Sequence, residues 1–162
     1  MDNTSVITLT NRQECSDAVH EVIGSAQQSI AIFSQNFEPL LYNHQHICDA
    51  ISSLARKNRH SKVRILVINT HSSASVGHCL ITLAQRLTST IQIRVPTTPE
   101  LQRFSESWLI ADDHTICQIN NPDRYEGSLI RENRLHVKPK LEFYDHAWEN
   151  SLPDQNTRRL SI

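Results

Sequence analysis

Two serine hydroxyls and an aspartate carboxylate lie within one short stretch of this sequence. A hydroxyl and a carboxylate are two of the three groups of a Ser-His-Asp hydrolytic site. Ser105 and Ser107 precede the apolar run 108–111, and Asp112 follows it. This pattern predicts a central strand that ends in a turn. A hydroxyl nucleophile needs a base, and His71 follows another predicted strand, so Ser105, His71 and Asp112 would suit acyl transfer. The spacing does not enforce that triad and no Gly-x-Ser-x-Gly motif accompanies it, so it stays an open alternative.

A second constellation has the ligand types of a metal site. His44-x-His46 lies close to Asp49. On a helix the two imidazoles would point to opposite sides, so a shared ion requires extended backbone there. Metalloprotease, phosphate-loop and dinucleotide motifs are absent, and the chain has only 3 glycines. We therefore expect no metal and no cofactor.

Strands and helices alternate along the chain. Strands are predicted by apolar or alternating runs at residues 6–9, 30–33, 63–68, 91–95, 108–111 and 116–119. Helices are predicted by helical spacing of apolar residues over 15–26, 47–55, 76–87 and 141–148. This order predicts an α/β fold with a mixed, mostly parallel sheet flanked by helices.

Polar residues follow the predicted strands where a ligand is expected. In such sheets ligands bind beyond the carboxyl ends of the strands. Ser34 and Gln35 follow one strand, and Asn69 follows the next. We predict that the side chains at this edge form one pocket, and the residues assigned to it are Ser105, Ser107, Asp112, Asn36, His71 and Asn120.

Length, charge and cysteine usage bound the class of protein. The 162 residues predict one domain, assigned to residues 1–152, with a flexible tail at 153–162. The net charge of -1 argues against a general nucleic-acid or membrane-surface binder. No apolar run approaches the roughly 20 residues of a membrane span, and residues 1–4 lack a signal-peptide pattern, so we expect a cytoplasmic protein.

The four cysteines, Cys15, Cys48, Cys79 and Cys117, form no Cys-x-x-Cys pair. We expect buried reduced thiols, with a disulfide or zinc framework as the alternative.

The order of elements and the stretch around Asp112 resemble one half of the phospholipase D superfamily. The signature of that family is His-x-Lys, four residues and then Asp. Ser105 stands at the His position, Ser107 at the Lys position and Asp112 at the Asp position. The acidic and aromatic segment 142–148 resembles the last helix of the family. The resemblance covers roughly residues 12–150 and implies a single-repeat phospholipase D-like domain.

The departures from the signature decide the expected activity. In the family the His attacks phosphorus and the Lys holds the phosphate oxygens. An unactivated serine hydroxyl is a poor nucleophile, and Ser107 brings no positive charge to the phosphoryl group. His-x-Lys recurs at His60 and His136, but no Asp follows either lysine at the required distance. The resemblance therefore implies a domain that has lost catalysis.

We accordingly expect an inactive binding, scaffolding or regulatory module. It resembles bacterial stand-alone or fused modules, some of which are associated with an acetyltransferase partner, and single-repeat relatives form homodimers. We expect a protein partner or a second copy of the chain, and no nucleic acid or membrane. One alternative is a weak phosphodiesterase or nuclease that uses His71 or His114 as its nucleophile. Another is a nucleic-acid accessory module that uses a basic cluster, which comprises Arg56, Lys57, Arg59, Lys62 and Arg64.

Overall fold

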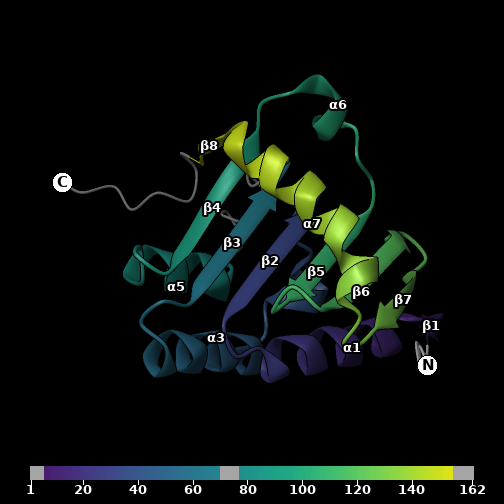
Figure 1. Cartoon of the computed structure of the whole chain (residues 1–162), viewed down its shortest axis with the longest axis horizontal. Helices are drawn as coiled ribbons and strands as arrows, with labels where there is room; N and C mark the ends of the chain where they lie inside the picture. Colours follow the sequence, from purple (N-terminus) through teal and green to yellow (C-terminus); the bar gives the residue numbers. More distant parts are fainter. Residues whose placement is uncertain (1–5, 70–76, 155–162) are drawn as a thin grey trace.

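The computed structural model describes residues 6–69 and 77–154, which form one sheet with helices on both faces (Figure 1). The strands are β1 (Val6–Leu9), β2 (Ser29–Ser34), β3 (Lys62–Val67), β4 (Ile91–Pro96), β5 (Ser107–Ala111), β6 (Thr115–Asn121), β7 (Glu126–Ile130) and β8 (Ser151–Pro153). The helices are α1 (Arg12–Ser25), α2 (Pro39–Tyr42), α3 (Gln45–Lys57), α5 (Cys79–Arg86), α6 (Pro99–Gln102) and α7 (Arg134–Glu149). None of these helices is long and apolar enough to cross a membrane.

The eight strands lie in the order β1-β7-β6-β5-β2-β3-β4-β8. The prediction of a mostly parallel sheet is wrong, because within the described residues only β2–β3 and β3–β4 pair in parallel and the other five ladders are antiparallel. The reason lies between β4 and β5. The helix in that connection, α6, has 4 residues, too few to return the chain to the far edge of the sheet. The chain therefore enters β5 from the edge at which β4 ends, and β5 runs antiparallel to β2.

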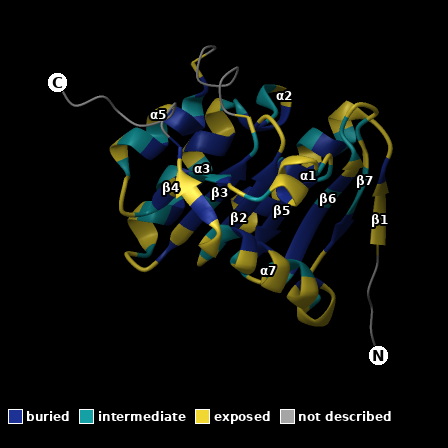
Figure 2. Cartoon of the chain, turned by 90° about the horizontal axis from the view of Figure 1, so that it is seen from above, coloured by how far each residue is buried: buried dark blue, intermediate teal, exposed yellow. Residues whose placement is uncertain are grey.

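Two apolar layers hold the helices to the sheet. Helices α1, α3 and α5 cover one face and α7 crosses the other, as Figures 1 and 2 show from two directions. Strand β2 is buried on both faces, as its continuous apolar run predicts: Ile30 and Ile32 pack toward the first group of helices, Ala31 and Phe33 toward α7. The Tyr144 hydroxyl of α7 lies 3.1 Å from the Ile32 carbonyl oxygen and 2.8 Å from that of Arg64. This contact fixes α7 against the centre of the sheet.

Three elements differ from their predicted extent. Strand β7 was not among the predicted strands, and Gly127 pairs with Ile119 there because a glycine has no Cβ to meet the backbone of β6. Helix α7 begins at Arg134, well before the predicted residue 141, and its N-cap Asn133 accepts a hydrogen bond from the His136 N–H. Strand β8 was not predicted either, and it pairs Pro153 with Arg94 at the edge of the sheet.

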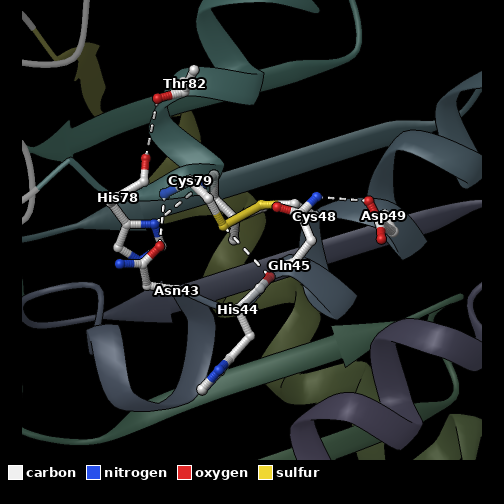
Figure 3. Close-up of a disulfide and its surroundings, with 9 residues drawn as sticks. Asn43, His44, Gln45, Cys48, Asp49, His78, Cys79 and Thr82 are labelled. Carbon is white, nitrogen blue, oxygen red and sulfur yellow. Dashed lines mark hydrogen bonds between the residues drawn. A yellow bond between two sulfur atoms is a disulfide. The ribbon is translucent and has the colours of Figure 1, made fainter.

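The expectation of four reduced thiols is wrong for one pair. Cys48 of α3 and Cys79 of α5 form a disulfide, although they are 31 residues apart in sequence (Figure 3). The two parallel crossovers place α3 and α5 side by side, an arrangement that cysteine spacing alone does not reveal. Cys15 and Cys117 are free and buried, as predicted, and burial raises their pKa values to about 11 and about 12.

Candidate functional site

The strand ends named in the sequence analysis form a narrow depression where β2 ends and β5 begins. The Ser34 hydroxyl accepts a hydrogen bond from the Phe37 N–H (3.0 Å), and the Ser107 hydroxyl donates to the Phe33 carbonyl oxygen (3.2 Å). Ser34 is 2% exposed and Ser107 6%. Burial raises the pKa of Tyr42, and a hydrogen bond with Ser107 opposes that rise. Both serine hydroxyls are therefore committed to the protein itself.

We call this depression the crevice. It encloses about 50 Å³, which is room for a few water molecules and far below the roughly 300–1,000 Å³ of typical ligand pockets. It is open at the surface, and apolar residues form only part of its wall. Its lining residues are Ser34, Gln35, Asn36, Glu38, Leu41, Ser107, Ile119, Pro122, Asp123 and Tyr125.

The charged groups of the crevice are acidic. Glu38 and Asp123 are carboxylates, and the described lining includes no lysine, arginine or histidine. The Tyr125 hydroxyl donates to Glu38 Oε1 at 3.4 Å. Desolvation raises the pKa of Tyr125, and the neighbouring Glu38 charge adds to that rise. A site for phosphoryl transfer needs positive charge at the phosphate oxygens, and the lining described here carries the opposite charge.

Asp112 does not share the crevice, and its assignment to that pocket is wrong. It follows the last residue of β5 whereas Ser107 is the first, so about 17 Å of strand separates them. Its carboxylate accepts three backbone hydrogen bonds, from the N–H groups of Gln27 (2.8 Å), Gln28 (2.7 Å) and Ser29 (3.0 Å). Asp112 therefore fixes the turn that joins α1 to β2, which is a structural role.

The other predicted site residues divide between the crevice and the surface. Asn36 lines the crevice together with Ser107. Ser105 is exposed in the loop before β5, Asn120 is exposed on β6, and neither is part of the lining. His71 lies outside the described residues. A triad of Ser105, His71 and Asp112 is excluded, because its serine and its carboxylate lie at opposite ends of β5.

The alternative nucleophile His114 also lies away from the crevice. It sits in the turn after Asp112, and its Nδ1 is 2.7 Å from the Thr115 hydroxyl. Three side chains that define the charge and hydrogen bonding of the lining were not among the predicted site residues, and they are Glu38, Asp123 and Tyr125. The last two lie in the turn that joins β6 to β7. Because β7 was not predicted, the sequence did not indicate that this turn lies at the same edge of the sheet.

The histidines proposed as metal ligands form a ring cluster at the junction of α1 and α3. The His20 ring lies 5.4 Å from the His44 ring and 6.2 Å from the His46 ring, both in edge orientation. Desolvation lowers the pKa of His20, with further contributions from His44 and His46. His44 Nε2 is 2.6 Å from the Leu40 carbonyl oxygen. Within residues 6–69 and 77–154 no group of three or more such side chains is arranged to hold a metal ion.

A rigid support lies beneath the crevice. The backbone reverses at Phe37, whose φ of 54° is in the left-handed region, and its buried ring stacks on His78 at 4.1 Å between centroids. His78 caps α5 by accepting a hydrogen bond from the Leu80 N–H, and burial lowers its pKa to about 4. The next residue, Cys79, carries the disulfide, and its N–H donates to Asn43 Oδ1 at 2.8 Å (Figure 3). The chain that lines the crevice is thus held through Phe37 to α5 and α3.

Comparison with family models decides the family. The model described as a domain of unknown function, DUF7931, matches residues 11–160. The chain belongs to this family. No curated protein matches it by sequence.

Solved structures decide the fold. A phospholipase D family member, Nuc from Salmonella typhimurium, superposes with a TM-score of 0.67 and 16% identity over 97% of this chain and 100% of that one. NucT from Helicobacter pylori gives a TM-score of 0.60 and 16% identity over 94% and 99% of the two chains. TrmBL2, an archaeal chromatin protein, gives 0.66 and 16% identity, and the match covers 95% of this chain but 56% of TrmBL2. The predicted resemblance to the phospholipase D fold is confirmed over nearly the whole chain.

Proposed function

We propose that this domain is a catalytically inactive member of the phospholipase D fold that acts by binding. The acidic lining of the crevice, in which the described residues include no lysine, arginine or histidine, carries the proposal. Phosphoryl transfer requires a nucleophile and compensation of negative charge, and Glu38 and Asp123 would repel a phosphodiester. The residue at the family's Lys position, Ser107, instead holds the backbone of β2.

The crevice suits contact with another protein better than retention of a small ligand. Its volume of about 50 Å³ is too small to enclose a substrate, and its rim carries exposed polar side chains such as Gln35 and Asn36. The partner is a separate protein, such as one of acetyltransferase type, or a second copy of this chain. Both belong to the proposal.

The test is an assay of the purified chain on bis(4-nitrophenyl) phosphate and on single-stranded DNA, with an active phospholipase D-family enzyme as positive control. We expect no turnover above the buffer rate. Asp112 is unsuitable as a catalytic control, because its carboxylate holds the α1–β2 turn. Turnover that disappears in His71→Ala or His114→Ala, while Ser105→Ala keeps it, would establish the alternative enzyme and refute the proposal.

A further inference from the structure

The strongest concentration of charge in this chain lies at the other end of the sheet from the crevice. Residues 56–64 contain five permanent cations and no carboxylate, although the net charge of the whole chain is -1. The four from Arg56 to Lys62 are exposed. Among the ion pairs of the described residues only Arg64 of this set takes part, with Asp145 at 2.7 Å. These five cations are Arg56, Lys57, Arg59, Lys62 and Arg64.

Local structure explains why the cations gather at this edge. Helix α3 ends at Lys57, where positive side chains complement the helix dipole. The chain turns tightly, and the Ser61 N–H donates to the Asn58 carbonyl oxygen at 3.0 Å. Lys62 then opens β3, and the Val63 N–H donates to the Thr90 carbonyl oxygen at 2.9 Å. This bond places the basic turn beside the loop that leads into β4.

A groove opens at this edge, on the face of the sheet that α7 crosses. Figure 1 shows that α7 runs diagonally over the sheet and that the starts of β3 and β4 lie beyond it. The groove has a volume of about 460 Å³, which is within the range of ligand sites. We call it the basic groove, and its lining residues are Ser29, Lys62, Val63, Arg64, Ser89, Thr90, Gln92, Asp113 and Trp148.

The groove combines three kinds of group. Lys62 and Arg64 supply positive charge, and the hydroxyls and the amide of the lining supply hydrogen-bond donors. Trp148 supplies an aromatic ring, which Arg94 and Arg64 approach to 4.8 Å and 5.8 Å from its centroid. Asp113 lies in the lining and Asp145 pairs with Arg64, so the positive charge of this edge comes from Lys62 and from the exposed cations of the neighbouring turn.

We propose that the basic groove binds single-stranded nucleic acid. A positive track for the phosphates with an aromatic ring for a base is the recurrent design of sequence-tolerant single-strand binding. A membrane surface would meet exposed cations but would not enter a concave groove. An acidic polypeptide would use the cations but gain nothing from the half-buried Trp148, whose ring already stacks against Tyr144 at 6.2 Å between centroids. The site is separate from the crevice, because the six residues of β3 place about 20 Å between the two edges.

The test measures binding of a short fluorescein-labelled oligothymidylate by anisotropy between about 50 and 200 mM salt. The variant Arg59→Ala/Lys62→Ala removes two exposed cations of this edge. Its matched control, Arg134→Ala/Lys138→Ala, removes two exposed cations from the start of α7, about 15–20 Å along that helix from Trp148. We expect the first variant to bind about tenfold more weakly, with a salt slope reduced by about 1.4, and the control to bind like the unmodified chain.

Tryptophan emission gives an independent readout. The chain has two tryptophans, and Trp108 is only 2% exposed. Stacking of a base on Trp148 should quench the unmodified chain, and Trp148→Phe should abolish the quench while it weakens binding about threefold at most, since an aromatic ring remains.

Three outcomes would overturn the proposal. They are no anisotropy change at the lowest salt, equal losses in the two double variants, and binding of poly-glutamate as tight as that of the oligonucleotide. The result is independent of catalysis, since it requires binding at the groove and no turnover.

Discussion

The crevice and the basic groove lie at opposite ends of the same central strands and differ in every property that decides binding. The crevice is small and acidic, and its serine hydroxyls bond to the backbone. The groove is larger, carries Lys62 and Arg64, and borders an exposed basic turn. The two linings share no residue.

This difference shows that polar residues at strand ends are weak indicators of a site. Ser34 and Ser107 have the residue types and the position of a binding edge, but their hydroxyls serve the fold. The cations near Lys62 do not follow the carboxyl end of a predicted strand, and their side chains are exposed. What separates the two regions is whether the polar atoms are already used by the protein.

The largest expected effect comes from removing the disulfide that supports the crevice, a change that leaves the groove intact. Cys48→Ser/Cys79→Ser removes a cross-link that spans 31 residues of sequence, so the free energy of unfolding should fall by about 3–4 kcal/mol under oxidising conditions. Urea unfolding followed by circular dichroism measures it.

The matched control is the unmodified chain with a phosphine reductant, which should show the same loss, whereas the variant should not respond to the reductant. Native-state alkylation should label no cysteine before reduction and the half-buried Cys79 afterwards, while buried Cys15, Cys48 and Cys117 stay protected. A reductant-insensitive unmodified chain would contradict the cross-link. Oligonucleotide binding should be unchanged in the variant.

Acid should destabilise the fold through His78, which lies in the support of the crevice. Burial lowers the pKa of His78 from 6.5 to about 4, so folding favours the neutral ring. Its contribution is complete above about pH 6.5 and is lost as the pH falls toward 4, for a total of about 3 kcal/mol. His78→Asn keeps an acceptor for the Leu80 N–H and cannot titrate, so its unfolding free energy should fall less steeply over this range. His60→Asn, at an exposed position, should retain the original slope; equal slopes in all three proteins would contradict the assignment.

The smallest effect lies at the groove end of β5, where two adjacent carboxylates have different tasks. Asp112→Asn replaces one acceptor oxygen with a donor against the N–H groups of residues 27–29, and should destabilise the fold by about 2 kcal/mol. Asp113→Asn has the same charge change and a similar φ, 63° against 54°, but an exposed side chain, and should change stability by less than about 0.5 kcal/mol. Chemical denaturation of the pair measures the difference. If the two substitutions cost the same, the three hydrogen bonds do not stabilise the turn.

The sequence was sufficient for the fold class and for part of the candidate site. The apolar run in β2 and the alternation of elements predict the central strands and the helices that cover them, and the resemblance to the phospholipase D fold is confirmed. The direction of β5 could not be predicted, because it depends on α6 being a single turn. Strand β7 was missed because its polar start and Gly127 suit a loop as well as a strand.

The misplacement of Asp112 was avoidable. Asp112 comes five positions after Ser107 along an extended strand, and the rise per residue alone puts the two side chains at opposite ends of that strand. The disulfide was not predictable in the same way. Cys48 and Cys79 lie on different helices, and only the crossover geometry brings them together.

The hydroxyl of Tyr144 has a consequence for how the basic groove can change in evolution. It anchors α7 to the carbonyl oxygens of β2 and β3, and Trp148 follows one turn later at the groove wall. Buried contacts therefore set the shape of the groove, while its charge depends on exposed side chains such as Lys62. Descendants of this chain can exchange one ligand preference for another by surface substitutions alone, without remodelling the cavity that receives the ligand.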